Sequence, residues 1–560
     1  MIKNPVLYGF NPDPAICRRG KDYYIAVSSF EWFPGIPVWH STDLQQWTLR
    51  THVLNQPSRV DLRKLPSAKG IWAPCLTWCE KDQLFYVVYG IMNSMNGRYF
   101  DIDNFLVTSE NIEGPWSEPV YLHSGGYDGS LFHDEDGRKW LVAVDWETRE
   151  GFCGAVSLVE YDPQRRQICG YPRRIWQGVY GMAEGAHITK RQGWYYIMCA
   201  EGGTGYGHCV TLGRSRSIDG PYQKDPHSPL LTSARQEDLL LPVSIDKDSE
   251  NGFDKDYLRK SCFNPDSVLQ KSGHASYTED EQGNVILAHL CARPLLPELA
   301  CTLGRETALQ KMCWTSDGWL RLATGGNLAE EYVSLGSGGS LGEEVERVEC
   351  INFLVDRLPA GWYSPRIAAE SFTTRDQIEG WLSLRGQESL CSQNQVSLLA
   401  RRLTSVYASL TIGMQFSPEV FQHNAGLVLY YDNMNYLFLQ QTFDEQRQCK
   451  ILYIIQLENG VRHEDHLDAA SPDGEIIGLR LTVDGHRVQF CWSADNQHWH
   501  TIGKAYKTTL FSDEHSRFGE FTGTFVGIAC VDSLLHRQQA HFNRLEYRAF
   551  EQRSLSKLPV

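Results

Sequence analysis

Long hydrophobic runs are missing from this sequence. No segment reaches about 18 consecutive apolar residues, the length that a membrane-spanning helix needs. The opening residues 1–6 contain neither the apolar core nor the cleavage motif of a secretory signal peptide. We therefore expect a soluble cytoplasmic protein with no membrane partner.

An excess of basic residues is also absent. The chain has 53 Lys and Arg against 68 Asp and Glu, which gives a formal net charge of -15. A field of this sign repels the phosphate groups of DNA and RNA, so we expect no nucleic-acid partner. Uncharged ligands meet no such barrier.

Closely spaced cysteine pairs are scarce as well. Of 16 Cys, only Cys75 and Cys79 stand within a short spacing of each other. Thiols stay reduced in a chain that is not exported, and most of these are expected to be small buried hydrophobic residues. The cysteines predict no metal site, and we expect no required cofactor.

Aromatic residues, by contrast, are abundant. The 560 residues include 16 Trp and 26 Tyr. Rings of this kind pack against sugars and other flat-faced ligands, although sheet cores use them too. The chain is also longer than the roughly 250 to 300 residues that one hydrophobic core supports, so we expect two domains.

A repeated unit fills the N-terminal half of the chain. Each copy opens with a short motif that ends in an apolar or aromatic residue, crosses a polar turn and enters an apolar strand, which predicts a β-hairpin. A third strand usually follows, so five such units predict a five-bladed β-propeller over residues 1–310. The opening motifs are Asp13-Pro14-Ala15-Ile16, Ala73-Pro74-Cys75-Leu76, Asp128-Gly129-Ser130-Leu131, Gly185-Ala186-His187-Ile188 and His274-Ala275-Ser276-Tyr277.

The spacing of the openers supports one repeated fold. The intervals are 60, 55, 57 and 89 residues, and the last contains a polar, acidic insertion at residues 233–262 that we expect to be a surface loop. Propellers that serve as protein-binding scaffolds carry Gly-His and Trp-Asp pairs in every blade, and this sequence does not show that pattern.

Three carboxylates stand at or beside one register of the repeat. Asp13 and Asp128 share it with His274, and Glu184 lies one position before it. Taken singly, such acids are typical of solvated turns. Inner propeller strands line the axis, however, so these side chains are expected to meet at one mouth. Glycosidic bond hydrolysis needs one protonated carboxyl and one ionised carboxylate, which makes a glycoside hydrolase the leading hypothesis.

At this point the residues resemble the β-xylosidases of glycoside hydrolase family 43. The likeness covers nearly the whole chain and implies a five-bladed propeller, an inverting mechanism and frequent α-L-arabinofuranosidase side activity. The motifs that carry it are Asn11-Pro12-Asp13-Pro14, Phe30-Glu31-Trp32-Phe33-Pro34-Gly35, Ile71-Trp72-Ala73-Pro74, Glu184-Gly185-Ala186-His187 and Leu303-Gly304-Arg305-Glu306-Thr307-Ala308.

The resemblance assigns roles to the charged residues. It implies that Asp13 is the general base, Glu184 the general acid, and Asp128 the third acid that raises the pKa of the proton donor. Arg305 resembles an arginine that reaches into the sugar pocket. Its guanidinium would keep neighbouring carboxylates ionised and donate hydrogen bonds to hydroxyls. A structural ion pair is the alternative role for Arg305.

Aromatic and histidine positions complete the expected site. Phe30 and Trp72 match family pocket residues, and Trp146 is a further candidate, although a lone Trp is more often part of a core. His274 resembles a histidine at the propeller axis that would hold water or a structural cation such as calcium. A neutral core histidine is the alternative.

A second domain is expected over residues 325–560. A glycine-rich stretch from Gly325 to Gly342 resembles a linker, and short alternating strands with regular turns then predict a β-sandwich. Family resemblance implies a concanavalin-like jelly roll that contributes to the active-site rim. Phe521, in Gly519-Glu520-Phe521-Thr522-Gly523, would close over the pocket, or else lie in the core of the sandwich.

The sequence therefore predicts an exo-acting, inverting β-1,4-xylosidase that trims xylose from the non-reducing end of short xylo-oligosaccharides. The alternatives are a carbohydrate-binding propeller without catalysis and an endo-acting arabinanase or xylanase of the same fold. The family resemblance also implies a homo-oligomer.

Overall fold

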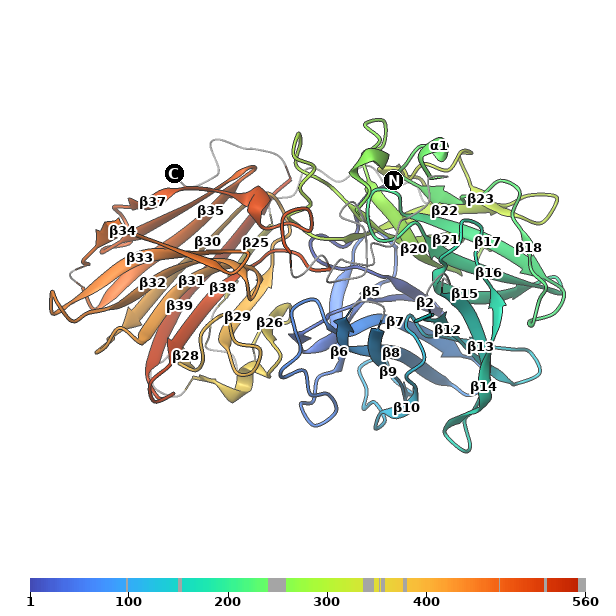
Figure 1. The fold of residues 1–560 in the computed structure, drawn as a ribbon, viewed down its shortest axis with the longest axis horizontal. Helices are drawn as coiled ribbons and strands as arrows, with labels where there is room; N and C mark the ends of the chain where they lie inside the picture. The colour runs from blue at the N-terminus through green and yellow to red at the C-terminus, as the bar shows by residue number, and fades with distance from the viewer. Residues whose placement is uncertain are drawn as a thin grey trace.

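The computed structural model comprises two β-rich units side by side along the long axis of the molecule (Figure 1). The N-terminal unit forms the blue-to-green half and the C-terminal unit the yellow-to-red half. The structure describes every residue except 97–98, 150–153, 240–257, 336–346, 352, 354–357, 376–379, 473, 518–520 and 552–560.

The N-terminal unit is the five-bladed propeller that the repeat predicts. Each blade is an antiparallel sheet of four strands, and the fourth blade carries one more, β19 (Leu231–Thr232). In order, the blades are β2 (Ala15–Arg19), β3 (Asp22–Ala26), β5 (Gly35–Ser41) and β6 (Thr48–Leu54); β7 (Gly70–Cys79), β8 (Leu84–Asn96), β9 (Tyr99–Ser109) and β10 (Val120–His123); β11 (Ser130–His133), β12 (Lys139–Asp145), β13 (Ala155–Asp162) and β14 (Gln167–Trp176); β15 (Glu184–Arg191), β16 (Trp194–Glu201), β17 (Cys209–Ser215) and β18 (Gln223–Lys224); and β20 (Gln270–Glu279), β21 (Val285–Ala292), β22 (Glu306–Trp314) and β23 (Leu320–Leu322).

The five opener residues share one unusual backbone conformation. Their φ angles are 57° at Asp13, 36° at Ala73, 54° at Asp128, 55° at Gly185 and 42° at His274. Left-handed φ values are uncommon outside glycine, so their recurrence at one register is a structural signature of the repeat. The innermost strands β2, β7, β11, β15 and β20 contact one another in a closed ring, which brings the openers together around the axis.

Most of the insertion that is expected to be a surface loop, residues 240–257, lies outside the described residues. Its described ends form the short helix α1 (Gln236–Leu239) and the 3-10 turn η1 (Lys260–Cys262). Leu239 and Cys262 are buried in a cluster with Tyr206 and Cys209, so both ends pack into the propeller. After the fifth blade, β24 (Tyr332–Val333) pairs with the N-terminal β1 (Ile2–Lys3).

The C-terminal unit is a sandwich of two eight-stranded sheets, and the short turns η2 (Ala369–Ser371) and η3 (Thr508–Leu510) flank its strands. One sheet contains β27 (Thr373–Thr374), β28 (Leu382–Arg385), β39 (Gln539–Phe550), β30 (Tyr407–Phe416), β35 (Ile476–Asp484), β36 (Arg487–Ser493) and β37 (His500–Lys507), with β25 (Arg347–Ile351) on β39. The other contains β34 (Val461–Ala470), β33 (Cys449–Glu458), β32 (Asn435–Asp444), β31 (His423–Asp432), β38 (Phe525–Asp532), β29 (Ser397–Arg402), β26 (Trp362–Pro365) and β4 (Trp32–Phe33).

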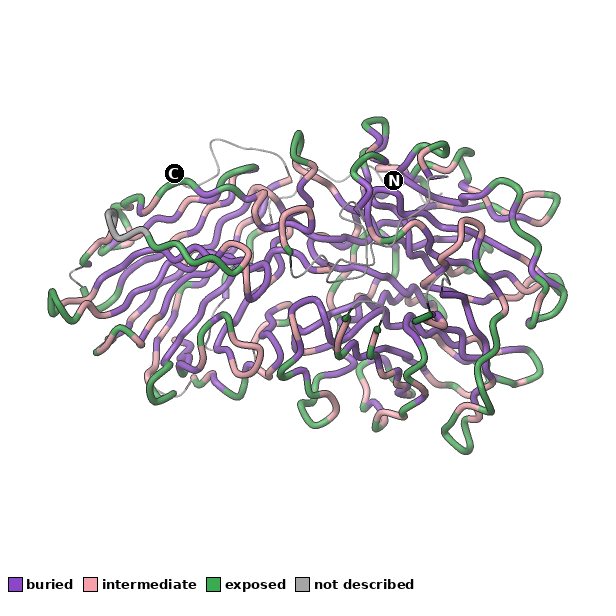
Figure 2. Tube along the Cα trace, in the orientation of Figure 1, coloured by how far each residue is buried: buried purple, intermediate pink, exposed green. Residues whose placement is uncertain are grey.

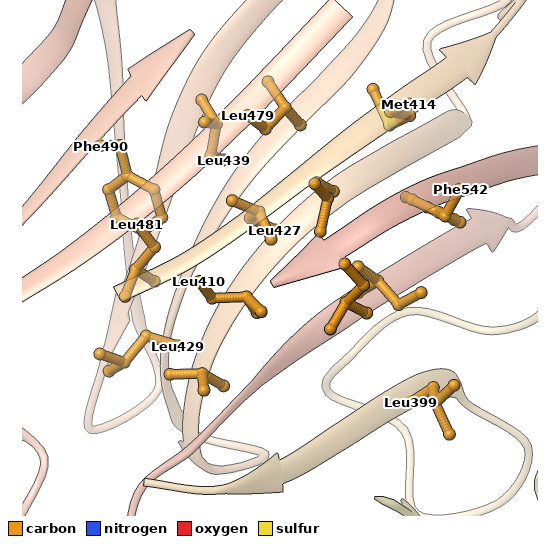
Figure 3. Close-up of a cluster of buried hydrophobic side chains, with 14 of the residues drawn as sticks. Leu399, Leu410, Met414, Leu427, Leu429, Leu439, Leu479, Leu481, Phe490 and Phe542 are labelled. Atoms are coloured by element: carbon orange, nitrogen blue, oxygen red, sulfur yellow. The ribbon is translucent and has the colours of Figure 1, made fainter. Parts of the chain in front are cut away.

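Alternating strand residues fill the space between the two sheets. Leu410 and Leu479 from one sheet and Leu427 and Leu439 from the other belong to a single buried cluster (Figure 3). Side chains of a strand point alternately to its two faces, so each strand needs only every second residue to be apolar for this core.

The propeller and the sandwich are joined by shared structure. Strand β4 belongs to the propeller segment but pairs with β26, and Trp32 of β4 stacks on Phe525 of β38 at 3.7 Å between ring centroids. Buried segments run through the strands of both units, whereas exposed segments gather at the turns (Figure 2). No helix among the described residues has the length and apolar character needed to cross a membrane.

Candidate active site

Asp13 lies in a charged and hydrogen-bonded setting at the axis. Arg305 Nη1 donates a hydrogen bond of 3.1 Å to its Oδ1, and Ser28 Oγ donates one of 2.7 Å to its Oδ2. His274 Nδ1 lies 3.6 Å from the same Oδ1. Burial opposes ionisation, but Arg305, His274 and the Ser28 hydrogen bond outweigh it and lower the pKa of Asp13 below its ordinary value. Asp13 is therefore ionised at neutral pH.

Glu184 and Asp128 are coupled through the start of β15. The backbone N–H of Gly185 donates a hydrogen bond of 3.0 Å to Asp128 Oδ2, and Tyr127 Oη donates one of 3.0 Å to Glu184 Oε2. Burial raises the pKa of Glu184 to about 7, and the charge of Asp13 acts in the same direction. Burial and the charge of Glu184 raise the pKa of Asp128 well above its ordinary value. Two carboxylates in this position resist double ionisation, so the pair retains a proton at neutral pH.

The position of Glu184 one residue before the opener register has a steric reason. The register position itself is Gly185, where an added Cβ would lie 2.9 Å from Nε2 of His274. A carboxylate at residue 185 would therefore collide with the imidazole, and the preceding residue supplies the acid instead.

Aromatic rings from both units cluster beside Arg305, the ion-pair partner of Asp13. Phe30 and Trp72 lie 6.0 Å apart between centroids, and Phe521 from the sandwich contacts Trp72 at 5.3 Å. The guanidinium of Arg305 lies 5.9 Å from the Phe30 ring and 5.5 Å from the Phe521 ring. These contacts place Phe521, which is partly exposed, against Trp72 and Arg305 of the propeller. Its neighbours Gly519 and Glu520 lie outside the described residues.

Close backbone packing holds the Phe521 segment beside Arg305. A Cβ added to Gly304 would lie 2.7 Å from the carbonyl oxygen of Thr522, and one added to Gly523 would lie 2.6 Å from that of Leu303. Glycine at both positions lets the two segments touch. The sandwich therefore contributes a ring to the same site as the propeller arginine.

Trp146 belongs to a second aromatic cluster that adjoins the first. Its ring stacks on Phe100 at 4.2 Å and lies 5.7 Å from Tyr127, whose own ring lies 6.2 Å from Trp72. Trp146 therefore contacts Tyr127, and Tyr127 in turn donates a hydrogen bond to Glu184.

The structure adds Ser28, Tyr127 and His208 to the residues expected from sequence. His208 is fully buried beneath Gly273, where an added Cβ would lie 2.3 Å from the imidazole, and burial lowers its pKa to about 3. Tyr127 directly precedes Asp128, a signal visible in the motif itself. Nothing in the sequence distinguishes Ser28 or His208 from core residues.

The described residues also bear on metal chemistry. Among them, no three His, Cys, Asp or Glu side chains converge in a group that could hold a metal ion.

The fold and the tuned carboxylates define a class, the glycoside hydrolases that work by acid and base catalysis on a propeller. A model of glycosyl hydrolases family 43 matches residues 2–320, and a model of the beta xylosidase C-terminal concanavalin A-like domain matches residues 350–548. The chain belongs to glycoside hydrolase family 43 and carries the C-terminal domain of its β-xylosidases.

Similar proteins match over almost the full length. "Xylosidase/arabinosidase 43B" of Humicola insolens is 36% identical over 98% of this chain and 97% of its own length. "Beta-xylosidase" of Bacillus subtilis is 35% identical over 98% of this chain and 99% of its own. The crystal structure of xylan beta-1,4-xylosidase from Bacillus halodurans superposes with a TM-score of 0.89 at 39% identity, covering 98% of this chain and 100% of that one.

Proposed function

We propose that the protein is an exo-acting, inverting β-1,4-xylosidase that releases xylose from the non-reducing end of short xylo-oligosaccharides and has α-L-arabinofuranosidase side activity. One observation carries the proposal. Three blades supply an ionised Asp13 and a Glu184–Asp128 pair that retains a proton. Beside Arg305, the partner of Asp13, lies an aromatic wall formed by Phe30, Trp72 and Phe521.

The mechanism follows from these protonation states. Asp13 accepts a proton from water as the water attacks the anomeric carbon, and Glu184 gives its proton to the leaving glycosidic oxygen. Asp128 accepts a hydrogen bond from the Gly185 backbone, and it shares one proton with Glu184 because the two buried carboxyls resist double ionisation. Tyr127 fixes the orientation of the acid by its hydrogen bond. Attack by water on the face opposite the leaving group inverts the anomeric configuration.

The aromatic wall supports recognition of an uncharged sugar. The rings of Phe30, Trp72 and Phe521 offer apolar faces to sugar C–H groups, and Arg305 offers N–H donors to hydroxyls. The names of the relatives from Humicola insolens and Bacillus subtilis support xylosides, and in the first case arabinosides, as the substrate class.

A substrate panel tests the proposal. The purified protein is incubated with 4-nitrophenyl β-xyloside, 4-nitrophenyl α-L-arabinofuranoside, xylobiose and polymeric xylan. An exo-xylosidase releases xylose from xylobiose and cleaves the aryl xyloside fastest, while xylan loses viscosity only slowly. Rapid loss of xylan viscosity would indicate an endo-acting enzyme, and binding without hydrolysis would indicate a carbohydrate-binding propeller.

We also propose that the enzyme acts in the cytoplasm. Four cysteines, Cys169, Cys313, Cys350 and Cys391, are exposed and form no disulfide, which suits a reducing compartment. Cell fractionation with an antibody against the chain tests this, and its recovery in the culture medium would contradict it.

A further inference from the structure

We propose that Glu201, a buried carboxylate with no part in the mechanism above, is a positioning residue for the general acid. This inference rests on the proposed role of Glu184 as proton donor. Glu201 ends β16, and its neighbour Ala200 is the strand partner of Glu184. Its side chain is fully buried. The two acids therefore lie on adjacent strands, and of the two only Glu184 takes part in the proposed proton transfer.

The Glu201 carboxylate holds the chain segment that leads into the general acid. Its Oε1 accepts a hydrogen bond of 2.7 Å from the backbone N–H of Val179. Its Oε2 accepts bonds of 2.7 Å from Tyr180 and 3.0 Å from Gly181. Three consecutive backbone donors thus converge on one carboxylate, three to five residues before Glu184. We call residues 177–183, which join β14 to β15, the acid loop.

The acid loop is shaped around this carboxylate. A Cβ added to Gly178 would lie 2.6 to 2.7 Å from the carboxylate atoms of Glu201, so glycine is needed for the approach. Gly181 has a φ of +131°, a conformation that side chains rarely adopt. Tyr180 packs against a buried cluster that contains Tyr206 and Cys209. The loop therefore has one anchored path from the blade edge to Glu184.

Carboxylates therefore accept hydrogen bonds from the backbone on both sides of Glu184. On the C-terminal side, Asp128 accepts from the N–H of Gly185. On the N-terminal side, Glu201 accepts from the acid loop. Proton transfer requires the donor within about 2.6 to 3.2 Å of the leaving oxygen, so a shift of the loop lowers the efficiency of the acid without removing it.

The substitution Glu201→Gln tests this arrangement with little change in size. Oε1 also accepts a bond of 2.6 Å from Thr211 Oγ1, so each oxygen faces two donors. An amide has one oxygen and one NH₂ group, and the NH₂ would face two donors in either orientation. The acid loop cannot keep all of its hydrogen bonds to a glutamine.

The readout is the ratio of kcat/KM for xylobiose to kcat/KM for 2,4-dinitrophenyl β-xyloside. When xylobiose is cleaved, the leaving oxygen belongs to a hydroxyl of the second xylose and needs the proton of Glu184. Dinitrophenolate is a stable anion and leaves without that proton. General acid assistance contributes about 10² to 10⁴-fold, so partial loss of alignment should lower the ratio by about tenfold or more. A general loss of folded enzyme lowers both values equally and leaves the ratio unchanged.

Thr211→Val is the matched control. It removes one hydrogen bond from the same buried carboxylate but leaves the three bonds to the acid loop in place. We expect it to lower the melting temperature and to keep the ratio of the wild type. If Glu201→Gln does not fold, Gly181→Ala decides, because space around Gly181 is open and the substitution strains only the backbone of the loop.

The result that supports the inference is a lowered ratio in Glu201→Gln or, if that variant does not fold, in Gly181→Ala, with Thr211→Val unchanged. A ratio within about twofold of the wild type in the deciding variant, or an equal fall in the control, would overturn it. Failure of the wild type to hydrolyse either xyloside would instead refute the proposed function, so the two failures are distinguishable.

Discussion

Arg305 and Asp13 form an ion pair between the fifth and first blades, with 3.1 Å between a guanidinium nitrogen and a carboxylate oxygen. Both side chains are almost fully buried, so the attraction is weakly screened by water. Arg305 also faces the rings of Phe30 and Phe521. One guanidinium therefore keeps Asp13, the proposed base, ionised and contacts the rings proposed to bind the sugar.

Replacing Arg305 should move the acidic limb of the pH profile. Asp13 must be ionised to act as a base, and Arg305 lowers its pKa, so Arg305→Met raises that pKa and shifts the acidic limb of kcat/KM to higher pH. Loss of a charged hydrogen bond, worth about 1.5 to 3 kcal/mol, should also lower kcat/KM by about 10 to 160-fold. Arg321→Met, which removes a guanidinium from the distant Asp225, is the control and should leave the limb in place. An unmoved limb in Arg305→Met would contradict this electrostatic role.

Replacing Tyr127 should shift the basic limb of the pH profile of kcat/KM to higher pH. Glu184 must be protonated to act as an acid, and the Tyr127 hydrogen bond stabilises its ionised form against the burial that raises its pKa to about 7. Tyr127→Phe therefore raises the pKa of Glu184 further and extends activity to higher pH. A pH series of kcat/KM checks this, with Tyr206→Phe as a control because its hydroxyl donates to a backbone carbonyl outside the carboxylate group. A basic limb that stays in place or moves to lower pH would contradict this action of the hydrogen bond on Glu184.

Phe521 and Phe525 should respond differently to truncation. Phe525 is fully buried and stacks on Trp32, so Phe525→Ala should cost about 3 to 5 kcal/mol of unfolding free energy. Phe521 is partly exposed against Trp72, so Phe521→Ala should raise KM for xylobiose with only a small change in melting temperature. Unchanged kinetics with a large loss of stability in Phe521→Ala would assign that ring to the core instead.

The sequence was sufficient for the propeller because the repeat is carried by local chemistry. Each opener precedes a polar turn and an apolar strand, and the structure places a left-handed residue at that same position in every blade. The pairing of Trp32 and Phe33 with the sandwich was not predictable, because two apolar residues in a loop do not reveal a partner more than 300 residues away.

The site was predictable where a motif contains charge and not where it contains a small or buried side chain. Asp13, Asp128 and Glu184 stand out by register. Ser28 is an ordinary strand-end serine until the fold brings its hydroxyl to Asp13. Glu201 resembles any solvated acid at the end of a strand, and only the turn of the acid loop shows that three backbone donors converge on it.

Removing either catalytic carboxylate should reduce turnover strongly while the fold persists. Asp13→Ala and Glu184→Ala should each lower kcat on xylobiose by about 10² to 10⁴-fold, because each group supplies one proton transfer. Glu184→Ala should lose much less on 2,4-dinitrophenyl β-xyloside, whereas Asp13→Ala should lose activity on both substrates. Circular dichroism establishes that each variant is folded. A loss below about tenfold on xylobiose would remove that residue from the mechanism.

The anomeric configuration of the first product tests the proposed direct attack by water most directly. Proton NMR of a fresh reaction with xylobiose resolves the anomeric signals before mutarotation mixes them. Direct attack by a water molecule that Asp13 activates inverts the β-linkage, so α-xylose should appear first and β-xylose should follow slowly. Initial release of β-xylose would contradict direct attack by water and would require a covalent glycosyl-enzyme intermediate.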